Sequence, residues 1–258
     1  MPAPTNPFKK ALREGKTQFG CWVSLANPYS TEMMGTAGFD WLLIDNEHSP
    51  NDLRSTMAQL AVLGSSPSHP VVRVPIGETY IIKQMLDAGA QSILVPMVES
   101  AEQARQLVRD VTYPPKGVRG VGYSLTRASR FSQITDYPHT ADAEICLLVQ
   151  VENRAGMANL DDILAVDGVD GVFIGPADLA ADMGHMGGML HADVQATIMD
   201  ALRRIRAAGK AAGILSTHDP MTQDALDAGA NFVAVGADVL LLNTAARALR
   251  DKWIDPAA

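Results

Sequence analysis

The sequence lacks the features that mark several special classes of protein. Basic residues are in deficit, with 21 Lys and Arg against 29 Asp and Glu, which gives a net charge of −8. This balance argues against nucleic acid as a partner, because nucleic-acid-binding domains present a basic surface to the phosphate backbone. No stretch reaches the roughly 18 uninterrupted apolar residues of a membrane span, so we expect no membrane partner. The first residues contain no apolar signal-peptide core, and we expect a cytoplasmic protein.

Cysteine is also scarce. The sequence contains two cysteines, Cys21 and Cys146, and both lie in apolar runs without the short spacing of metal-ligand cysteines. We therefore expect buried free thiols instead of a disulfide or a cysteine nucleophile.

The chain has enough apolar sequence for a large core. Its 258 residues are 47% hydrophobic and 19% charged, which is typical of a globular protein. No segment resembles a linker, so we expect one domain over residues 1–258.

Eight short apolar runs, rich in β-branched residues, recur along the chain. Each run is nearly continuous in apolar residues, as in strands that are buried on both faces of a parallel sheet. The runs cover Phe19–Leu25, Trp41–Asp45, Val71–Pro75, Ser92–Pro96, Cys146–Glu152, Gly171–Pro176, Ala212–Ser216 and Phe232–Gly236.

Helical patterns separate these runs, with apolar residues at three- and four-residue steps. They cover Asn51–Leu63, Thr79–Ala88, Ala101–Arg109, Ala192–Ala208 and Val239–Arg250. Eight strands alternating with helices predict an α/β fold, a (β/α)₈ TIM barrel. A doubly wound sheet is the alternative, although no GxGxxG motif follows the first run.

Glycines and long connections punctuate this pattern. Gly38, Gly89 and Gly229 lie where helices should end, and we expect each to adopt the left-handed conformation. The irregular stretch 113–143 is too long for an ordinary connection and predicts a functional loop. The glycine-rich stretch 182–190 predicts a flexible lid at the barrel rim.

Acidic residues gather at the expected carboxyl ends of the strands, where the chemistry of such barrels is located. Glu152 ends an apolar strand, and Asp178 follows the GPAD turn after the next strand. Two oxygen ligands without a cysteine or histidine cluster favour a hard divalent ion, Mg²⁺ or Mn²⁺. The alternatives are that both acids are solvated loop residues, or that Asp178 caps a short helix. Backbone amides at Ala177 and Asp178 would then suit a substrate carboxylate.

One arginine and one histidine lie at the same predicted rim. Arg73 ends the third strand and can contact an anion, or it can only pair with Asp45 or Glu47. His48 follows the second strand, and its position near the metal and the arginine makes it the candidate base. His218, after the seventh strand, is the one rival.

Several segments, in order, resemble the class II pyruvate aldolases of the HpcH/HpaI family. They are WLLIDNEHSP, PVVRVP, YPPKGVRGVG, LLVQVEN, GVDGVFIGPADLAADMG and FVAVGAD, and together they span nearly the whole chain. The resemblance implies a (β/α)₈ barrel that binds a divalent metal, Mg²⁺ or Mn²⁺ with Co²⁺ as a further candidate. It also implies reversible cleavage of 4-hydroxy-2-oxo acids to pyruvate, or a close analogue of it, and an aldehyde. No Schiff-base lysine is needed, and no Lys occupies an expected strand end.

The resemblance also implies roles for individual residues. Glu152 and Asp178 would hold the metal, Gln150, Ala177 and Asp178 would contact pyruvate, Arg73 would stabilise the enolate and His48 would act as the base. Trp22, Val121 and Leu215 correspond to residues that line the aldehyde side. Asp87 corresponds to an aspartate that raises the basicity of the histidine.

The position of Asp87 predicts an oligomer. It lies near the end of the helix that descends from the catalytic rim, and therefore at the opposite end of the barrel from His48 of the same chain. If Asp87 orients His48, it must come from a neighbouring subunit, and the site is shared. The resemblance implies a homo-oligomer, with a hexamer as the expected size. The alternative is that Asp87 only belongs to a helix-exit pattern, because Asp227 holds the same place in the second LDAGA segment.

Two other functions remain open at this point. A carbon–carbon lyase that acts on a CoA thioester, of the malyl-CoA or citryl-CoA type, would use a similar acidic pair. A non-catalytic barrel that binds an oxo acid would not need His48, Arg73 and both acids together.

Overall fold

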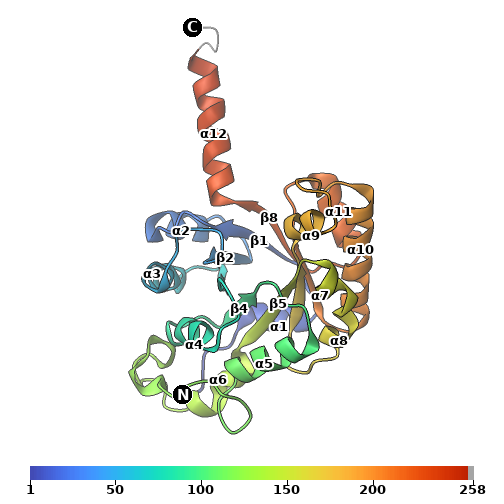
Figure 1. The fold of residues 1–258 in the computed structure, drawn as a ribbon. Helices are drawn as coiled ribbons and strands as arrows, with labels where there is room; N and C mark the ends of the chain where they lie inside the picture. Colours follow the sequence, from blue (N-terminus) through green and yellow to red (C-terminus); the bar gives the residue numbers. More distant parts are fainter. Residues whose placement is uncertain (255–258) are drawn as a thin grey trace.

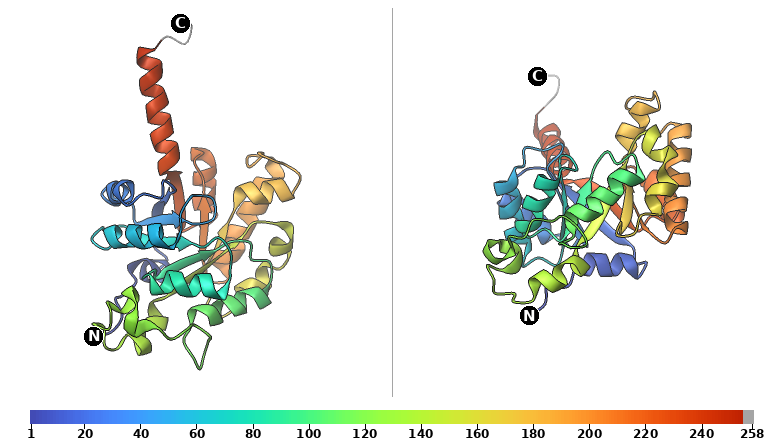
Figure 2. Two further views of the ribbon diagram at one scale, coloured as in Figure 1. Left: turned by 60° about the vertical axis from the view of Figure 1, so that its left-hand side comes forward. Right: turned by 60° about the horizontal axis from the view of Figure 1, so that its bottom comes forward.

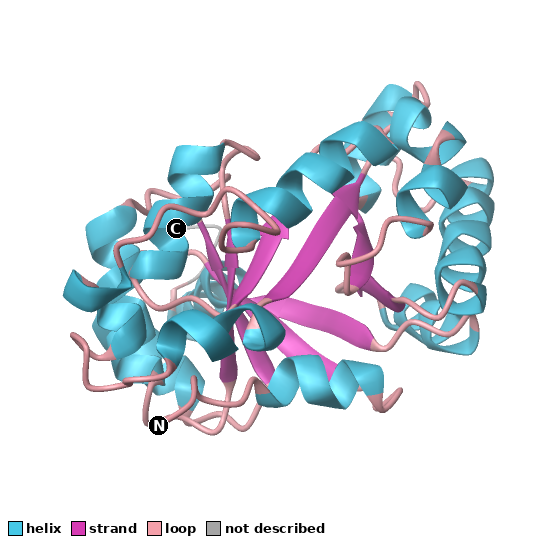
Figure 3. Ribbon diagram, turned by 90° about the horizontal axis from the view of Figure 1, so that it is seen from below, coloured by secondary structure: helices cyan, strands magenta, loops and turns pink. Residues whose placement is uncertain are grey.

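Eight parallel strands close into a barrel in sequence order in the computed structural model, which describes residues 1–254. Figure 3 shows this ring of strands from below, with helices outside it. The strands are β1 (Gln18–Val23), β2 (Trp41–Asp45), β3 (His69–Arg73), β4 (Ser92–Val95), β5 (Cys146–Val151), β6 (Gly171–Ile174), β7 (Ala211–Leu215) and β8 (Phe232–Ala237). The prediction of a (β/α)₈ barrel is confirmed.

Helices lie between successive strands, before the first strand and after the last (Figure 1). They are α1 (Pro7–Arg13), α2 (Pro28–Gly35), α3 (Leu53–Leu63), α4 (Thr79–Asp87), α5 (Ala101–Val111), α6 (Tyr137–Glu144), α7 (Arg154–Ala158), α8 (Leu160–Leu164), α9 (Pro176–Asp182), α10 (Ala192–Ala207), α11 (Asp219–Asp227) and α12 (Asp238–Trp253). The predicted glycine exits are confirmed, with φ of 91° at Gly38, 105° at Gly89 and 100° at Gly229.

The inside of the barrel is filled by one side-chain cluster, separate from the cluster between the strands and the helices. Trp22, Trp41 and Phe173 belong to the inner cluster, whereas Leu42 and Ile44 of β2 belong to the outer one. This alternation follows from the two-residue period of a strand. It also directs the last inward-facing residue of each strand to the carboxyl end of the barrel.

Both cysteines are buried and free, as expected. Burial raises the pKa of the Cys21 thiol to about 12 and that of Cys146 well above its usual value. Neither thiol is therefore suited to nucleophilic chemistry, because the thiolate is the reactive form.

The connection between α5 and β5 is more ordered than the sequence pattern predicted. It contains two short 3₁₀ helices, Tyr123–Leu125 and Arg127–Ser129, followed by α6. Buried Tyr113, Ile134 and Tyr137 form a small core of their own with Ala3. This segment lies at the amino-terminal end of the barrel, close to the start of the chain (Figure 1).

Helix α12 leaves the barrel instead of packing against it, as all views show (Figure 2). Strand β8 passes directly into the helix, whose N-cap is Ala237. Buried Asp238 accepts hydrogen bonds from the amides of Ser24 (2.8 Å) and Leu25 (3.2 Å), which ties the helix start to the end of β1. Every residue from 239 to 254 is exposed. No helix within residues 1–254 is both long and apolar enough to cross a membrane.

Close packing inside the barrel predicts the cost of adding one methyl group. A Cβ at Gly20 of β1 would lie 2.2 Å from an atom of the buried Trp41 ring, whereas one at Gly236 of β8 would lie 3.6 Å from Cys21 Sγ. We expect Gly20→Ala to lower the free energy of unfolding by about 1–3 kcal/mol, and Gly236→Ala to change it much less. Urea unfolding of both variants measures the difference, and equal stabilities would contradict the packing described here.

Candidate active site

Polar side chains from four neighbouring segments meet at the carboxyl end of the barrel. Asp45 and Arg73 are the last residues of β2 and β3 and are paired in register. Gln150 lies on β5, Glu152 follows that strand, and Asp178 lies in the first turn of α9 after β6. The two predicted metal ligands therefore come from adjacent βα units.

Arg73 is held rigidly by two acids. Its Nε and Nη2 donate to the two carboxylate oxygens of Asp45, each at 2.8 Å, and its Nη1 lies 2.9 Å from Glu47 Oε2. The guanidinium carbon lies 5.5 Å from the centroid of the Trp22 ring. The two-pronged contact with Asp45 fixes the plane of the guanidinium. The pairing of Arg73 with Asp45 and Glu47, one of the alternatives left open by the sequence, is therefore observed. This pairing orients Arg73 but does not bury it completely, since 9% of its side chain is exposed.

Glu152 is fixed from two sides. Its Oε1 accepts a hydrogen bond from the amide of Met97 (2.9 Å), and its Oε2 accepts one from the side-chain amide of Gln150. Gly175 makes room for the carboxylate, because a Cβ there would lie only 2.3 Å from Glu152 Oε2. The side chain of Glu152 thus occupies a cradle that a larger residue at position 175 would fill.

The site carries more negative charge than its arginine balances. Burial raises the pKa of Glu152, and the nearby Asp178 carboxylate raises it further, whereas the two hydrogen bonds and Arg73 lower it. Burial also raises the pKa of Glu47, against the lowering effect of Arg73. Oε1 of Gln150 is buried and has no hydrogen-bond partner within residues 1–254. An additional positive charge would relieve the repulsion between these acids.

These residues fit a divalent cation in their donor chemistry. Glu152 and Asp178 supply carboxylate oxygens, which suit a hard ion such as Mg²⁺ or Mn²⁺. No third metal-ligand side chain joins these two carboxylates within residues 1–254. The one group of three such side chains in this part of the chain lies elsewhere. Further ligands at this site would have to be water or substrate.

The other predicted residues at this end of the barrel differ in burial and contacts. His48 is exposed, with its Nε2 3.9 Å from Glu47 Oε1. Trp22 is buried in the inner cluster, and Leu215 packs against the same cluster. His218 caps α11 by accepting a hydrogen bond from the amide of Met221, which gives it a structural role.

The alternative that Asp178 caps a short helix is wrong. Gly175 is the N-cap of this helix, and Ala177 and Asp178 lie within its first turn. Asp178 therefore does not cap the helix. Its carboxylate is not engaged by the backbone in that way, which leaves it available as a ligand.

Asp87 and Val121 lie at the other end of the barrel. Asp87 is the last residue of α4, which leads into the start of β4, and a Cβ at Gly122 would lie 3.9 Å from Asp87 Oδ2. Val121 is exposed beside it. The sequence prediction that Val121 lines the site together with Trp22 and Leu215 does not hold within one chain, because strand and helix directions place them at opposite ends.

A buried arginine lies next to Asp87. Arg119 is fully buried and its Nη2 lies 3.9 Å from Asp87 Oδ1. The guanidinium packs 4.3 Å from the centroid of the Tyr113 ring and donates to the Tyr137 hydroxyl (3.2 Å). Burial raises the pKa of Asp87, while Arg119 and Lys83 lower it. This carboxylate is therefore positioned, and only partly neutralised, at the surface of the amino-terminal end.

Sequence reasoning missed four contributors to the site. Asp45 and Glu47 were seen only as possible partners of Arg73, although their place beside it gave a signal. Gly175 was not singled out, although the GPAD turn contains it. Met97 gave no signal at all, since its role depends on a left-handed backbone with φ of 55°, which aims its amide at Glu152.

Comparison with known proteins gives consistent results over nearly the whole chain. The family model described as HpcH/HpaI aldolase/citrate lyase matches residues 18–245. A hydroxypyruvate/pyruvate aldolase from Roseobacter denitrificans is 63% identical over 253 residues, 98% of this chain and 99% of the relative. A 4-hydroxy-2-oxo-heptane-1,7-dioate aldolase from Salmonella dublin is 53% identical, covering 96% and 94%. A solved HpcH/HpaI aldolase/citrate lyase family protein from Burkholderia cenocepacia J2315 has a TM-score of 0.91 at 39% identity, covering 96% and 99%.

The buried charge of Glu152 predicts a pH-dependent stability. A pKa raised above the ordinary 4.5 means that the folded state binds this proton more tightly than the unfolded chain does. The free energy of unfolding therefore falls as pH rises from about 4.5 to the raised pKa. In EDTA at about pH 7, Glu152→Gln should therefore stabilise the protein by about 1 kcal/mol. Gln150 can turn its unpartnered oxygen toward the new amide, so no hydrogen bond need be lost.

The measurement is the thermal midpoint of both proteins as a function of pH. The advantage of the variant should shrink as pH falls from the raised pKa toward 4.5 and be largely gone below 4.5, because Glu152 is then protonated in both folded and unfolded chains. A variant that is less stable than wild type at neutral pH would contradict the unbalanced charge.

Proposed function

The chain belongs to the HpcH/HpaI aldolase/citrate lyase family, and from this premise we propose that it cleaves 4-hydroxy-2-oxo acids reversibly to a 2-oxo acid and an aldehyde. The fold and the relatives make it a carbon–carbon lyase of the aldolase type. Pyruvate and hydroxypyruvate are the proposed 2-oxo acids, because the relatives' names mention both. Relatives at 53–63% identity are named as aldolases, which favours this function over a lyase for CoA thioesters.

One observation carries the proposal: Arg73, held by two acids, lies at the same rim as the excess carboxylates of Glu152 and Asp178. In the cleavage direction, a bond between C3 and C4 of the substrate breaks, and its electron pair moves onto the 2-oxo oxygen as an enolate. Such a reaction needs positive charge at that oxygen and a base at the C4 hydroxyl. The rim supplies the arginine and the ligands of a cation.

Glu152 and Asp178 are the proposed ligands of a divalent ion, Mg²⁺ or Mn²⁺, with Co²⁺ as a further candidate. When bound, the ion would supply Lewis acidity for the 2-oxo group. Gln150 and the amide of Ala177 are proposed to hold the substrate carboxylate and oxo oxygen. The buried Gln150 side chain has a fixed place beside Glu152, which makes it suited to orient a small ligand.

Arg73 is proposed to stabilise the enolate oxygen. Asp45 binds one edge of the guanidinium and fixes its position. Little conformational entropy is therefore lost when the guanidinium interacts with the developing negative charge. Trp22 beneath it and Leu215 nearby give the site an apolar floor. The shape of this floor would bear on which aldehyde is accepted.

His48 is proposed as the base that takes the proton from the C4 hydroxyl. It lies exposed at the rim, next to Glu47, where a substrate can reach it. The aldehyde then leaves, and protonation of the enolate at C3 completes the cleavage. The same groups run the reaction backwards during synthesis.

Removal of metal is the direct test of this proposal. Treatment with EDTA should abolish release of pyruvate from a 4-hydroxy-2-oxo acid, and Mg²⁺ or Mn²⁺ should restore it. Coupled reduction of pyruvate by lactate dehydrogenase measures the rate. If borohydride traps a covalent substrate adduct instead, the enzyme uses an imine and the proposed metal role is wrong.

Substitution of His48 should separate the base from the metal site. His48→Ala should lower aldol cleavage by about 10²- to 10⁴-fold, yet leave metal-dependent exchange of the pyruvate C3 protons largely intact. Arg73→Ala should lower both reactions, because enolate charge develops in each. His218→Ala is the matched control and should leave cleavage near the wild-type rate.

Proton exchange is followed by NMR in deuterated water. Equal loss of exchange and cleavage in His48→Ala would mean that His48 supports the metal or the enolate, and the proposed role would be wrong.

We further propose that the enzyme works as a homo-oligomer whose active sites are shared, with a hexamer expected from the family resemblance. Asp87 and Val121 cannot reach His48 of their own chain, because they lie at the opposite end of the barrel. Both are presented at the surface, and Asp87 is held beside Arg119. The rim of one subunit against the amino-terminal end of another would complete the site.

Helix α12 gives a second, independent reason to propose an assembly. Leu240, Leu241 and Leu242 are more than half exposed, and Trp253 is 75% exposed. An isolated helix of this length is marginally stable in water without a partner for its apolar side chains. Val235 of β8 and Phe19 of β1 are themselves partly exposed, so the outside of this barrel has room for a helix from a second copy.

A mixing experiment tests the shared site. His48→Ala and Asp87→Ala subunits, each inactive, are mixed under conditions that exchange subunits. Random assembly should restore about a quarter of the sites, in which both residues are intact. The double variant His48→Ala/Asp87→Ala, mixed in equal amount with wild type, controls for exchange. Exchange should lower the intact sites in that mixture from about half to about a quarter of the total. A monomer with full activity would end the proposal.

A further inference from the structure

Two histidines that are not among the candidate active-site residues meet in the turn between α9 and α10. Gly184 and Gly187 adopt left-handed conformations, with φ of 88° and 72°. The amide of His185 donates to Ala180 O (2.7 Å), and the amide of His191 donates to Gly188 O (2.9 Å). These bonds fold the glycine-rich stretch back on itself and bring His185 next to His191. The stretch predicted to be a flexible lid is thus an ordered turn held by backbone hydrogen bonds.

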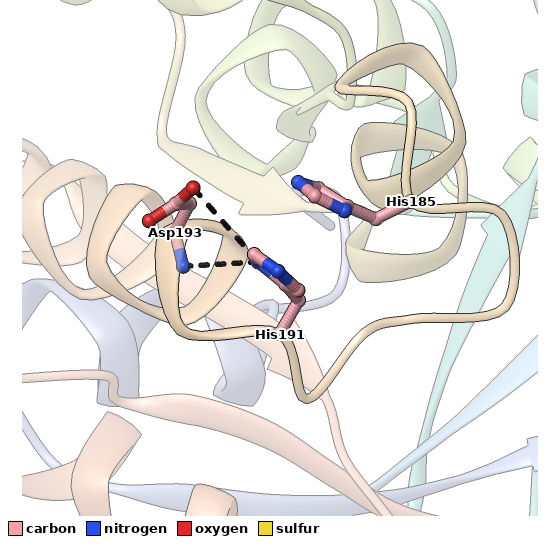
Figure 4. Close-up of side chains that lie close together, drawn as sticks. All are labelled: His185, His191 and Asp193. Carbon is pink, nitrogen blue, oxygen red and sulfur yellow. Dashed lines mark hydrogen bonds and ion pairs between the residues drawn. The ribbon is translucent and has the colours of Figure 1, made fainter.

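The two imidazole rings and one carboxylate form a compact cluster (Figure 4). The ring centroids of His185 and His191 are 3.6 Å apart with an interplanar angle of 17°. His191 Nδ1 lies 3.9 Å from Asp193 Oδ2. One ligand atom from each of the three residues lies within 4.8 Å of the others, and no other set of three such residues does so in residues 1–254.

Helix capping explains only part of this arrangement. His191 is the N-cap of α10, and its Nδ1 accepts a long hydrogen bond of 3.4 Å from the amide of Asp193. The ring of His185 has no hydrogen bond within the described part of the chain, and capping gives no reason for it to stack on His191. A role that needs both rings accounts for the cluster better.

We propose that His185, His191 and Asp193 bind a borderline divalent transition ion such as Zn²⁺ or Co²⁺. Two imidazole nitrogens with one carboxylate are typical ligands of these ions, whereas Mg²⁺ prefers oxygen alone. The three side chains are partly or largely exposed, so small rotations can bring their ligand atoms to the spacing of a tetrahedral site, with water as the fourth ligand. Binding through Nδ1 of His191 would replace the weak cap bond to that nitrogen and would turn the two rings out of their stack.

Such an ion would join the turn to the first residues of α10. The site differs in chemistry from the oxygen pair of Glu152 and Asp178, and it does not depend on the proposed catalytic function. A transition metal added to the enzyme would therefore have two places to bind, and Mg²⁺ only one.

Metal binding in excess Mg²⁺ tests the site. Wild-type protein is stripped with a chelator, dialysed against Co²⁺ with Mg²⁺ in excess, and analysed for bound cobalt and for its visible absorption. We expect one Co²⁺ per chain at this site, with binding weakened at least about tenfold in His185→Ala and Asp193→Asn. His139→Ala, which removes a single exposed histidine of α6, is the matched control and should bind Co²⁺ as wild type does.

His185→Ala is the decisive variant, because it removes no helix cap. Circular dichroism checks that each variant keeps its fold. Unchanged Co²⁺ binding in His185→Ala, or an equal loss in His139→Ala, would overturn the proposal. The first result would mean that Co²⁺ binds elsewhere, such as at Glu152 and Asp178. The second would mean that surface histidines bind it without a defined site.

Discussion

Closure of eight strands into one barrel is the constraint on which the site depends. Closure forces every strand to alternate between the inside and the outside, so that inward positions of different strands meet in layers. Asp45, Arg73 and Gln150 are the last such inward residues of their strands, and Glu152 continues the alternation of β5. Their side chains meet because the barrel closes, although more than 100 residues separate Asp45 from Glu152.

Interactions between charges then position the side chains at the carboxyl end of the barrel. Arg73 is shared by Asp45 and Glu47, and burial together with the nearby Asp178 carboxylate keeps the pKa of Glu152 raised although Arg73 lowers it. Burial disfavours the charged form of Glu152, and the proposed cation would offset that cost. Gly175 leaves room for this carboxylate, and Met97, in a left-handed conformation, donates its amide to it.

The outer surface is incomplete in two places. The direct passage from β8 into α12 leaves that helix without a covering neighbour, and Asp87 with Arg119 forms an ordered charged site far from the rim of its own chain. Neither feature by itself indicates an assembly. Together they agree with the proposed assembly, in which other copies of the chain would complete the active site.

The sequence by itself determined the fold and the identity of the rim residues. Apolar runs, helical periods and the exits at Gly38, Gly89 and Gly229 are local signals, and strand direction alone places Glu152, Asp178 and Arg73 at one end. Only the tertiary structure decided how Arg73 is gripped, which amide reaches Glu152, where α12 points and that His185 stacks on His191. These features depend on side-chain conformations and on distances between segments far apart in the chain, and a periodic pattern contains no information about either.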